Sequence, residues 1–100
     1  MSVTELSGKL AEGSITLVDV RNAEDRAKAS IAAARPLDDE TMQALSQLPH
    51  DAPLAFICHH GNSSRGAAEH FRKQGFTQVF NVQGGMDAWS QEVDNTIPRY

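Results

Sequence analysis

The sequence contains a single cysteine, Cys58, among its 100 residues. One thiol excludes an internal disulfide, and it leaves no partner for the Cys-x-x-Cys pair of a dithiol redox enzyme. The first five residues lack the charged and apolar pattern of a secretory signal peptide. One free thiol and no signal fit best in a reducing compartment, so we expect the protein in the cytoplasm.

Long apolar runs and an excess of positive charge are also missing. No apolar stretch approaches the roughly 20 residues that a membrane-spanning helix needs. Nine lysines and arginines stand against 13 aspartates and glutamates, which gives a net charge of −4. Because nucleic acids and anionic membranes attract positive surfaces, we expect neither as a partner, although a local positive pocket is compatible with this balance.

The chain shows no internal repeat, no low-complexity tract and no internal domain boundary. A length of 100 residues suits one modest hydrophobic core, and 40% of the residues are hydrophobic. We therefore predict a single domain over residues 1–100, in which residues 94–100 form a tail.

Short β-prone stretches alternate with amphipathic ones along the chain. The predicted strands, of which the second is a weak extended segment, are residues 15–20, 31–37, 54–57 and 78–82. The predicted helices are residues 5–12, 23–29, 39–48, 66–75 and 86–92. Strands that alternate with helices indicate the α/β class, with a mostly parallel sheet covered by helices on both faces.

Several residues suit the ends of these helices. The candidates for capping the helix starts are Thr4, Asn22 and Asp38 or Asp39. Gly13 and Gly75 are natural helix stops. Within the helix 66–75, Glu69 and Lys73 are four residues apart, which favours an ion pair between them.

The segment with the clearest chemical potential lies between the strand 54–57 and the helix 66–75. Its residues are Cys58, His59, His60, Gly61, Asn62, Ser63, Ser64 and Arg65. Unpaired N–H groups at a helix N-terminus, together with the positive end of the helix dipole, favour a bound anion. A thiolate is such an anion, and its pKa falls beside a cation such as Arg65. Gly61 and, less readily, Asn62 can adopt the positive φ angles that turn successive N–H groups inward.

These side chains also have plainer interpretations. Cys58 could be a buried structural thiol, but the polar loop, the helix start and Arg65 favour a reactive thiolate. Arg65 could be merely solvated, but a cation at a helix N-terminus is unfavourable unless an anion lies near, so we favour binding of the substrate or the thiolate. His59 and His60 could suggest a metal, but three adjacent residues rarely point at one ion, so we predict none. We expect His59 at a pocket mouth and His60 in hydrogen bonds within the loop.

Three segments should meet at one edge of the sheet, because ligands of such sheets bind at the carboxyl ends of the strands. These segments are residues 19–21, Cys58 and residues 83–85. Asp19 is expected to be structural, bonded to loop N–H groups or to an arginine. Arg21 either faces the pocket or pairs with Asp25, and the sequence leaves both open.

The segment 58–65, with Leu-Val-Asp-Val-Arg at 17–21 upstream and Gly-Gly-Met-Asp-Ala-Trp at 84–89 downstream, resembles the rhodanese family. The similarity is greatest to the small single-domain thiosulfate sulfurtransferases of bacteria. It implies a three-layer α/β/α fold with a mostly parallel central sheet, and an enzyme that needs no cofactor. Two departures are that rhodaneses usually have a short strand before the first helix, and a Gly-His pair where Ala29 and Ser30 stand.

The resemblance implies that Cys58 attacks the outer sulfur of thiosulfate, expels sulfite and keeps a persulfide. Cyanide, a small thiol or a thioredoxin-like protein would then accept that sulfur. Backbone N–H groups of residues 59–64 would stabilise the terminal persulfide anion, as an oxyanion hole stabilises oxygen.

Three other functions use the same fold. A persulfide carrier that relays sulfur for a protein partner would need the same residues with a different donor. A cysteine phosphatase or arsenate reductase needs an arginine six residues after the cysteine to grip an oxyanion, but Ser64 holds that position and Arg65 follows it. A non-catalytic rhodanese-like module typically lacks the cysteine, so Cys58 disfavours it.

Overall fold

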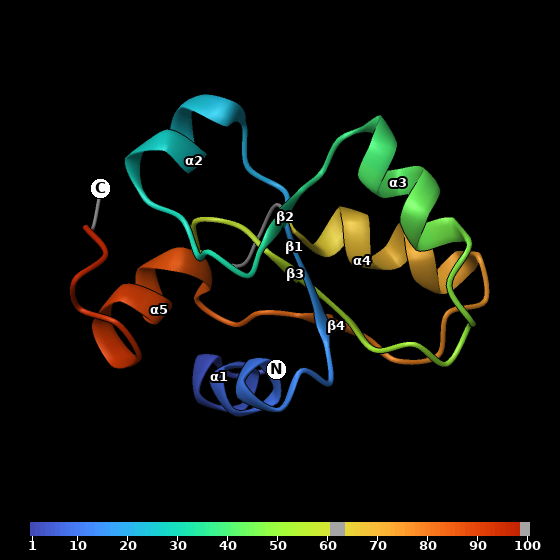
Figure 1. Ribbon diagram of the computed structural model, residues 1–100, viewed down its shortest axis with the longest axis horizontal. Coiled ribbons are helices and arrows are strands. Elements are labelled where there is room, and N and C mark those ends of the chain that lie inside the picture. Colours follow the sequence, from blue (N-terminus) through green and yellow to red (C-terminus); the bar gives the residue numbers. More distant parts are fainter. Residues whose placement is uncertain (61–63, 99–100) are drawn as a thin grey trace.

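The computed structural model describes residues 1–60 and 64–98. Its helices and strands alternate in the predicted order (Figure 1). The elements are α1 (Val3–Glu12), β1 (Thr16–Asp19), α2 (Ala23–Lys28), β2 (Arg35–Pro36), α3 (Asp39–Ser46), β3 (Leu54–Ile57), α4 (Ser64–Lys73), β4 (Val79–Asn81) and α5 (Gly85–Glu92).

The four strands form one sheet in the order β2-β1-β3-β4, and every neighbouring pair is parallel. Val18 in β1 lies between Arg35 of β2 and Phe56 of β3. The predicted parallel sheet is therefore confirmed. The extended segment 31–37 contributes only Arg35 and Pro36, because a turn closed by Ala34 N–H to the Ile31 carbonyl at 2.9 Å takes up its first part.

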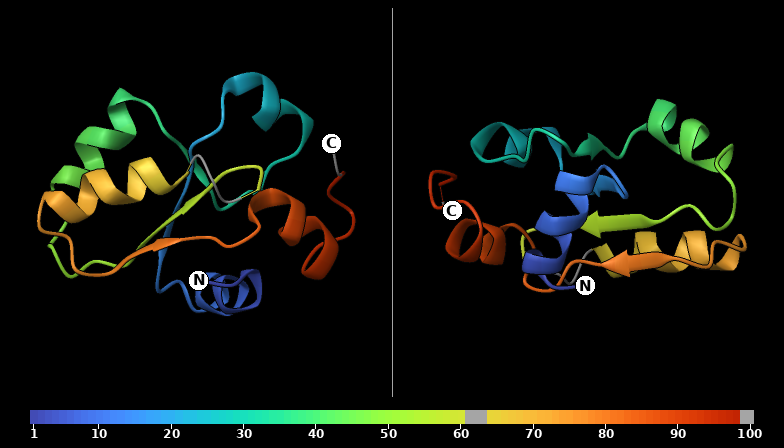
Figure 2. Two further views of the ribbon diagram at one scale, coloured as in Figure 1. Left: turned by 180° about the vertical axis from the view of Figure 1, so that it is seen from behind. Right: turned by 60° about the horizontal axis from the view of Figure 1, so that its bottom comes forward.

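Helices cover both faces of the sheet. Figures 1 and 2 show α1 and α5 on one side and α3 and α4 on the other. Alternate residues of β3 enter the two cores: Ala55 and Ile57 pack with residues of α1 and α5, whereas Leu54 and Phe56 pack with residues of α3 and α4. The central strand β3 is an uninterrupted apolar run because both of its faces are buried. The predicted three-layer α/β/α arrangement is confirmed, and Trp89 packs in the first core as expected.

Met1 lies beside the edge of β4, where the resemblance left the sheet uncertain. Its amino group donates to the Asn81 carbonyl at 3.0 Å, and its own carbonyl accepts from the Gln83 N–H at 2.9 Å. Met1 thus occupies one backbone group of β4 and one just after it, at the edge where an additional strand would pair.

The N-cap of α1 is Ser2, so the prediction of Thr4 was wrong. The Ser2 hydroxyl accepts from the Glu5 N–H at 3.1 Å, and it also donates to the Glu5 carboxylate at 3.3 Å. The spacing Ser2-x-x-Glu5 is a capping box, and it places Thr4 inside the first turn. The N-caps Asn22 and Asp38 are confirmed.

Helix α4 also differs from the prediction. It begins at Ser64, two residues before the expected start. Glu69 pairs with Arg72, with 2.6 Å between their charged atoms, and not with Lys73. Spacings of three and four residues both bring side chains together on a helix, and here the shorter one is used.

Asp38 generates a prediction about acid stability. Its carboxylate accepts a hydrogen bond from the Thr41 N–H at 2.8 Å, which lowers the pKa of Asp38 below its ordinary value of 3.8. A lowered folded-state pKa adds stability above the unfolded value, and this contribution is lost as the pH falls through the folded value. Asp38→Asn keeps a capping oxygen without the charge. We expect its deficit in free energy of unfolding, measured in urea, to be constant from pH 7 to 5 and to shrink below about pH 3.8. A deficit that grows in acid would contradict this account.

Candidate functional site

The carboxyl ends of β1 and β3 meet the N-terminus of α5. The Val20 N–H, just after β1, donates to the Ile57 carbonyl at 3.0 Å. The N–H groups of Met86 and Asp87 in α5 donate to the carbonyls of Cys58 and His59, at 2.7 and 3.0 Å. The predicted convergence of three distant segments at one edge of the sheet is confirmed.

Two glycines allow α5 to approach this closely. The first N–H groups of a helix have no partner within it, and in α5 those of Met86 and Asp87 are satisfied by the carbonyls of Cys58 and His59. Gly84, the N-cap, has φ 74°, and Gly85 has φ 58°. A Cβ atom on Gly85 would lie 2.2 Å from the Cys58 carbonyl oxygen, so only glycine fits there.

Cys58 opens into a cavity of about 260 Å³ at this edge. The lining residues are Val20, Arg21, Asn22, Asp25, Cys58 and His59. Cys58 is 3% exposed, so the cavity is where a small reactant can reach its sulfur. His59 is half-buried in the wall, while His60 is exposed with its ring centre 4.0 Å from that of His59. The hydrogen bonds expected for His60 within the loop stay a prediction.

Asp19 and Arg21 form a buried ion pair behind this wall. Arg21 Nη2 lies 2.6 Å from Asp19 Oδ2, and Arg21 Nε lies 2.9 Å from Asp19 Oδ1. The guanidinium also donates to the carbonyls of Asp25 and Ala29, at 3.3 and 2.6 Å. Asp19 is therefore bonded to an arginine, which was one of its expected arrangements. Arg21 lines the cavity, which was one of its two expected arrangements, and its ion pair is with Asp19.

Ser64 lies beside the cysteine sulfur. It is fully buried at the start of α4, and its hydroxyl oxygen is 3.4 Å from Cys58 Sγ. The same hydroxyl is hydrogen-bonded to the side-chain oxygen of Asn81, the last residue of β4. The sequence analysis did not identify Asn81. Its one signal is a polar amide at the carboxyl end of a strand, a residue type that strands disfavour.

The remaining predicted site residues divide into two groups. Gly61, Asn62 and Ser63 lie outside the described residues, so their predicted roles stay predictions. Arg65 is exposed in the first turn of α4. No carboxylate in residues 1–60 or 64–98 pairs with it. It is therefore available to an external anion.

Within the part of the chain that the structure describes, no three His, Cys, Asp or Glu side chains are grouped as a metal site would require. In the same residues, no helix has the length and apolarity to cross a membrane.

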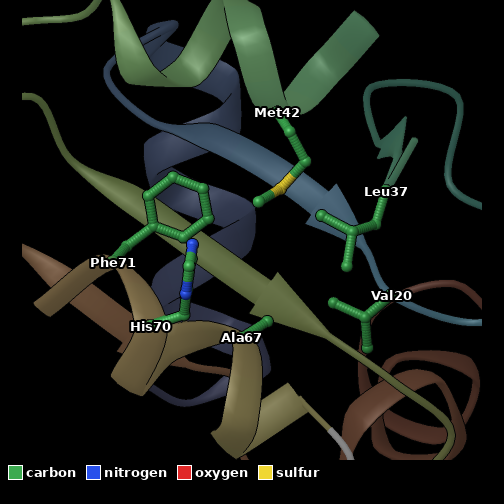
Figure 3. A pocket seen from close by; sticks show the side chains of 6 residues that line it. All are labelled: Val20, Leu37, Met42, Ala67, His70 and Phe71. Carbon is green, nitrogen blue, oxygen red and sulfur yellow. The ribbon is translucent and has the colours of Figure 1, made fainter. Parts of the chain in front are cut away.

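A second, apolar cavity of about 320 Å³ lies between α3 and α4 (Figure 3). Its lining residues are Val20, Leu37, Met42, Ala67, His70 and Phe71. Val20 belongs to both cavities. The wall after β1 therefore separates a polar space at Cys58 from an apolar one on the α3–α4 face.

The close approach at Gly85 predicts a stability difference between two glycine substitutions. Gly13 and Gly85 both have left-handed backbone angles, but a Cβ on Gly13 would meet nothing within 4 Å. Gly13→Ala should cost only the backbone penalty, about 1–2 kcal/mol. Gly85→Ala should cost clearly more and should change the reactivity of Cys58, because the Cys58 carbonyl must move. Urea unfolding and alkylation of Cys58 measure the two effects, and equal costs for the two variants would disprove the contact.

The comparisons with known proteins agree with this geometry. The model of the rhodanese-like domain family matches residues 2–92. The thiosulfate sulfurtransferase GlpE of Pseudomonas paraeruginosa is 35% identical over 86 residues, which cover 85% of this chain and 78% of that protein.

Two solved structures extend the likeness. A rhodanese-related protein of Thermoplasma volcanium has a TM-score of 0.76 and 28% identity, over 93% of this chain and 91% of that one. The polysulfide-sulfur transferase homodimer of Wolinella succinogenes has a TM-score of 0.72 and 29% identity, over 92% of this chain and 72% of that one. From the matched span, the shared fold and the relative at 35% identity, the chain belongs to the rhodanese-like domain family.

Proposed function

We propose that this protein is a sulfurtransferase that moves sulfane sulfur from thiosulfate to a nucleophilic acceptor through a persulfide on Cys58. The observation that carries the proposal is the position of the thiol. Cys58 lies between the end of β3 and the start of α4, and it opens into the cavity at the carboxyl edge of the sheet. The likeness to a relative named for thiosulfate supports that donor.

In the first half-reaction, the Cys58 thiolate attacks the outer sulfur of thiosulfate. A sulfur–sulfur bond forms to Cys58 Sγ, and the bond within thiosulfate breaks. Sulfite leaves with the electron pair of that bond. The total charge is unchanged: the thiolate and thiosulfate carry three negative charges together, and so do the persulfide and sulfite. The terminal sulfur on Cys58 carries the negative charge.

In the second half-reaction, an acceptor attacks the terminal sulfur. Cyanide leaves as thiocyanate, and the Cys58 thiolate is restored. A small thiol or a thioredoxin-like protein takes the sulfur in the same way and becomes a persulfide. Both steps move electron pairs between sulfur atoms and the nucleophile, so the proposed cycle uses neither a cofactor nor a metal.

The surroundings of Cys58 suit an anion at each stage. The first turn of α4 has N–H groups that find no partner within the helix, and it carries the positive end of the helix dipole. Arg65 adds a positive charge in that turn, and the Ser64 hydroxyl lies 3.4 Å from Sγ. A thiolate stabilised in this way needs no general base.

A relay of persulfide sulfur for a protein partner is the second candidate. One observation favours a donor other than thiosulfate, as this candidate requires: the Wolinella succinogenes relative, at 29% identity, is named for polysulfide sulfur. The same Cys58 chemistry serves either donor. We also propose that the protein acts in the cytoplasm, where its single thiol stays reduced.

The proposal predicts a single, reversible adduct. Thiosulfate should make the intact protein heavier by one sulfur atom, and a thiol reductant or cyanide should remove it with formation of thiocyanate. Because the chain has one cysteine, Cys58→Ser is a complete control. An adduct that persists in Cys58→Ser would disprove the mechanism. An adduct that forms with polysulfide but not with thiosulfate would support the second candidate.

The role of Arg65 is tested by kinetics. Hydrogen bonds to charged groups contribute about 1.5–3 kcal/mol. Arg65→Ala should therefore lower kcat/KM for thiosulfate by about tenfold to a hundredfold. Arg65→Lys should restore part of the loss, because lysine keeps the charge without the planar fork.

A matched control is Lys73→Ala, which removes one positive charge from the last turn of the same helix. It should leave the thiosulfate kinetics unchanged. Cys58 alkylation near neutral pH should slow in Arg65→Ala only. Equal effects of the two substitutions would assign Arg65 to general electrostatics rather than to binding.

A further inference from the structure

The Ser64 hydroxyl stands between two acceptors. One is Cys58 Sγ, 3.4 Å away, and the other is the side-chain oxygen of Asn81. Ser64 is fully buried, so water does not compete at this position. The bond to Asn81 connects α4 with β4, between residues that are 17 positions apart in the sequence.

A hydroxyl has one proton to donate and lone pairs to accept with. When Cys58 is a neutral thiol, its own proton can point to the Ser64 oxygen while Ser64 donates to Asn81. When Cys58 is a thiolate, it can only accept, and the Ser64 proton is one that it can accept. Asn81 and the thiolate therefore compete for one proton.

Asn81 is held on the sheet and not on the loop. It pairs with Phe56 in the register of β3 and β4, and its backbone carbonyl accepts from the Met1 amino group at 3.0 Å. An acceptor fixed in this way can accept the hydrogen bond from the Ser64 hydroxyl whether Cys58 is a thiol or a thiolate.

We propose that Asn81 is a positioning residue that acts through Ser64, directing the hydroxyl proton away from Cys58 and so limiting how much of the cysteine is thiolate. This inference rests on the proposed function only in naming Cys58 as the nucleophile. It adds a residue that disfavours the Cys58 thiolate, whereas Arg65 and the helix dipole favour the thiolate.

Other charged groups lie on the segments around Cys58, and the test must leave them unchanged. They are Arg21, Asp25 and His59 in the cavity wall, Asp19 behind Arg21, Arg65 in α4 and Asp87 in α5. Asn81→Leu alters none of them, and it replaces an amide by an apolar side chain of nearly the same size.

The experiment measures the rate of Cys58 alkylation by iodoacetamide from pH 5 to 10. In Asn81→Leu the midpoint of the profile should move to lower pH. Below the midpoint the rate should rise by about threefold to tenfold, the range that one neutral hydrogen bond covers. If Asn81→Leu does not fold, Asn81→Val introduces a β-branched residue, which strands favour, and should act in the same direction.

A second pair of variants separates positioning from structure. In a Ser64→Ala background, Asn81→Leu should leave the midpoint unmoved, because the connecting hydroxyl is gone. Ser64→Thr keeps the hydroxyl and should restore the response to Asn81→Leu. An unmoved or raised midpoint in Asn81→Leu alone, or an equal shift without Ser64, would overturn the proposal.

Alkylation needs no sulfur donor, so the result stands whether or not thiosulfate loads Cys58. Failure of the sulfurtransferase proposal would appear as no persulfide in the mass of the native protein. Failure of the Asn81 proposal would appear in the alkylation profile alone.

Discussion

Two hydrogen bonds from the start of α5 to the carbonyls of Cys58 and His59 hold the site together. They tie the segment that leaves β3 to a helix that follows β4, so the backbone that follows the Cys58 Cα atom is anchored at two successive carbonyls. The contact exists because Gly85 has no Cβ and can adopt φ 58°. The same bonds satisfy N–H groups that a buried helix start would otherwise leave unpaired. One close approach thus serves both the stability of α5 and the placement of the thiol.

The sequence predicted the elements well where a local pattern was sufficient. Leu54 to Ile57 is an apolar run that only a strand buried on both faces explains, and the structure buries all four residues. The prediction of a shared edge followed from the direction of parallel strands alone, which is why the convergence of Asp19, Cys58 and Gly85 could be anticipated. Cap positions were less secure, since Ser2 and Thr4 both carry a suitable hydroxyl and only Ser2 has Glu5 three residues later.

What the sequence could not give is contact between distant residues. No local pattern connects Ser64 with Asn81, or the Met86 N–H with the Cys58 carbonyl, because these contacts depend on strand order and helix placement. Arg21 illustrates the same limit at short range. Asp19 and Asp25 are both near it in sequence, and the strand end turns its guanidinium toward Asp19, where burial makes a fully bonded pair necessary.

The proposed cycle gives a reason for a residue that limits formation of the Cys58 thiolate. In the unloaded thiolate the negative charge is on Sγ, where the Ser64 hydroxyl can donate to it. After sulfur transfer the charge is on the terminal sulfur, and the neutral Sγ is a weak acceptor, so Ser64 can donate fully to Asn81. An acceptor that competes with the thiolate but not with the persulfide lowers the free energy of the loaded state relative to the unloaded one. On this argument, Asn81 favours the retention of sulfur on Cys58, while Arg65 and the N-terminus of α4 favour its arrival.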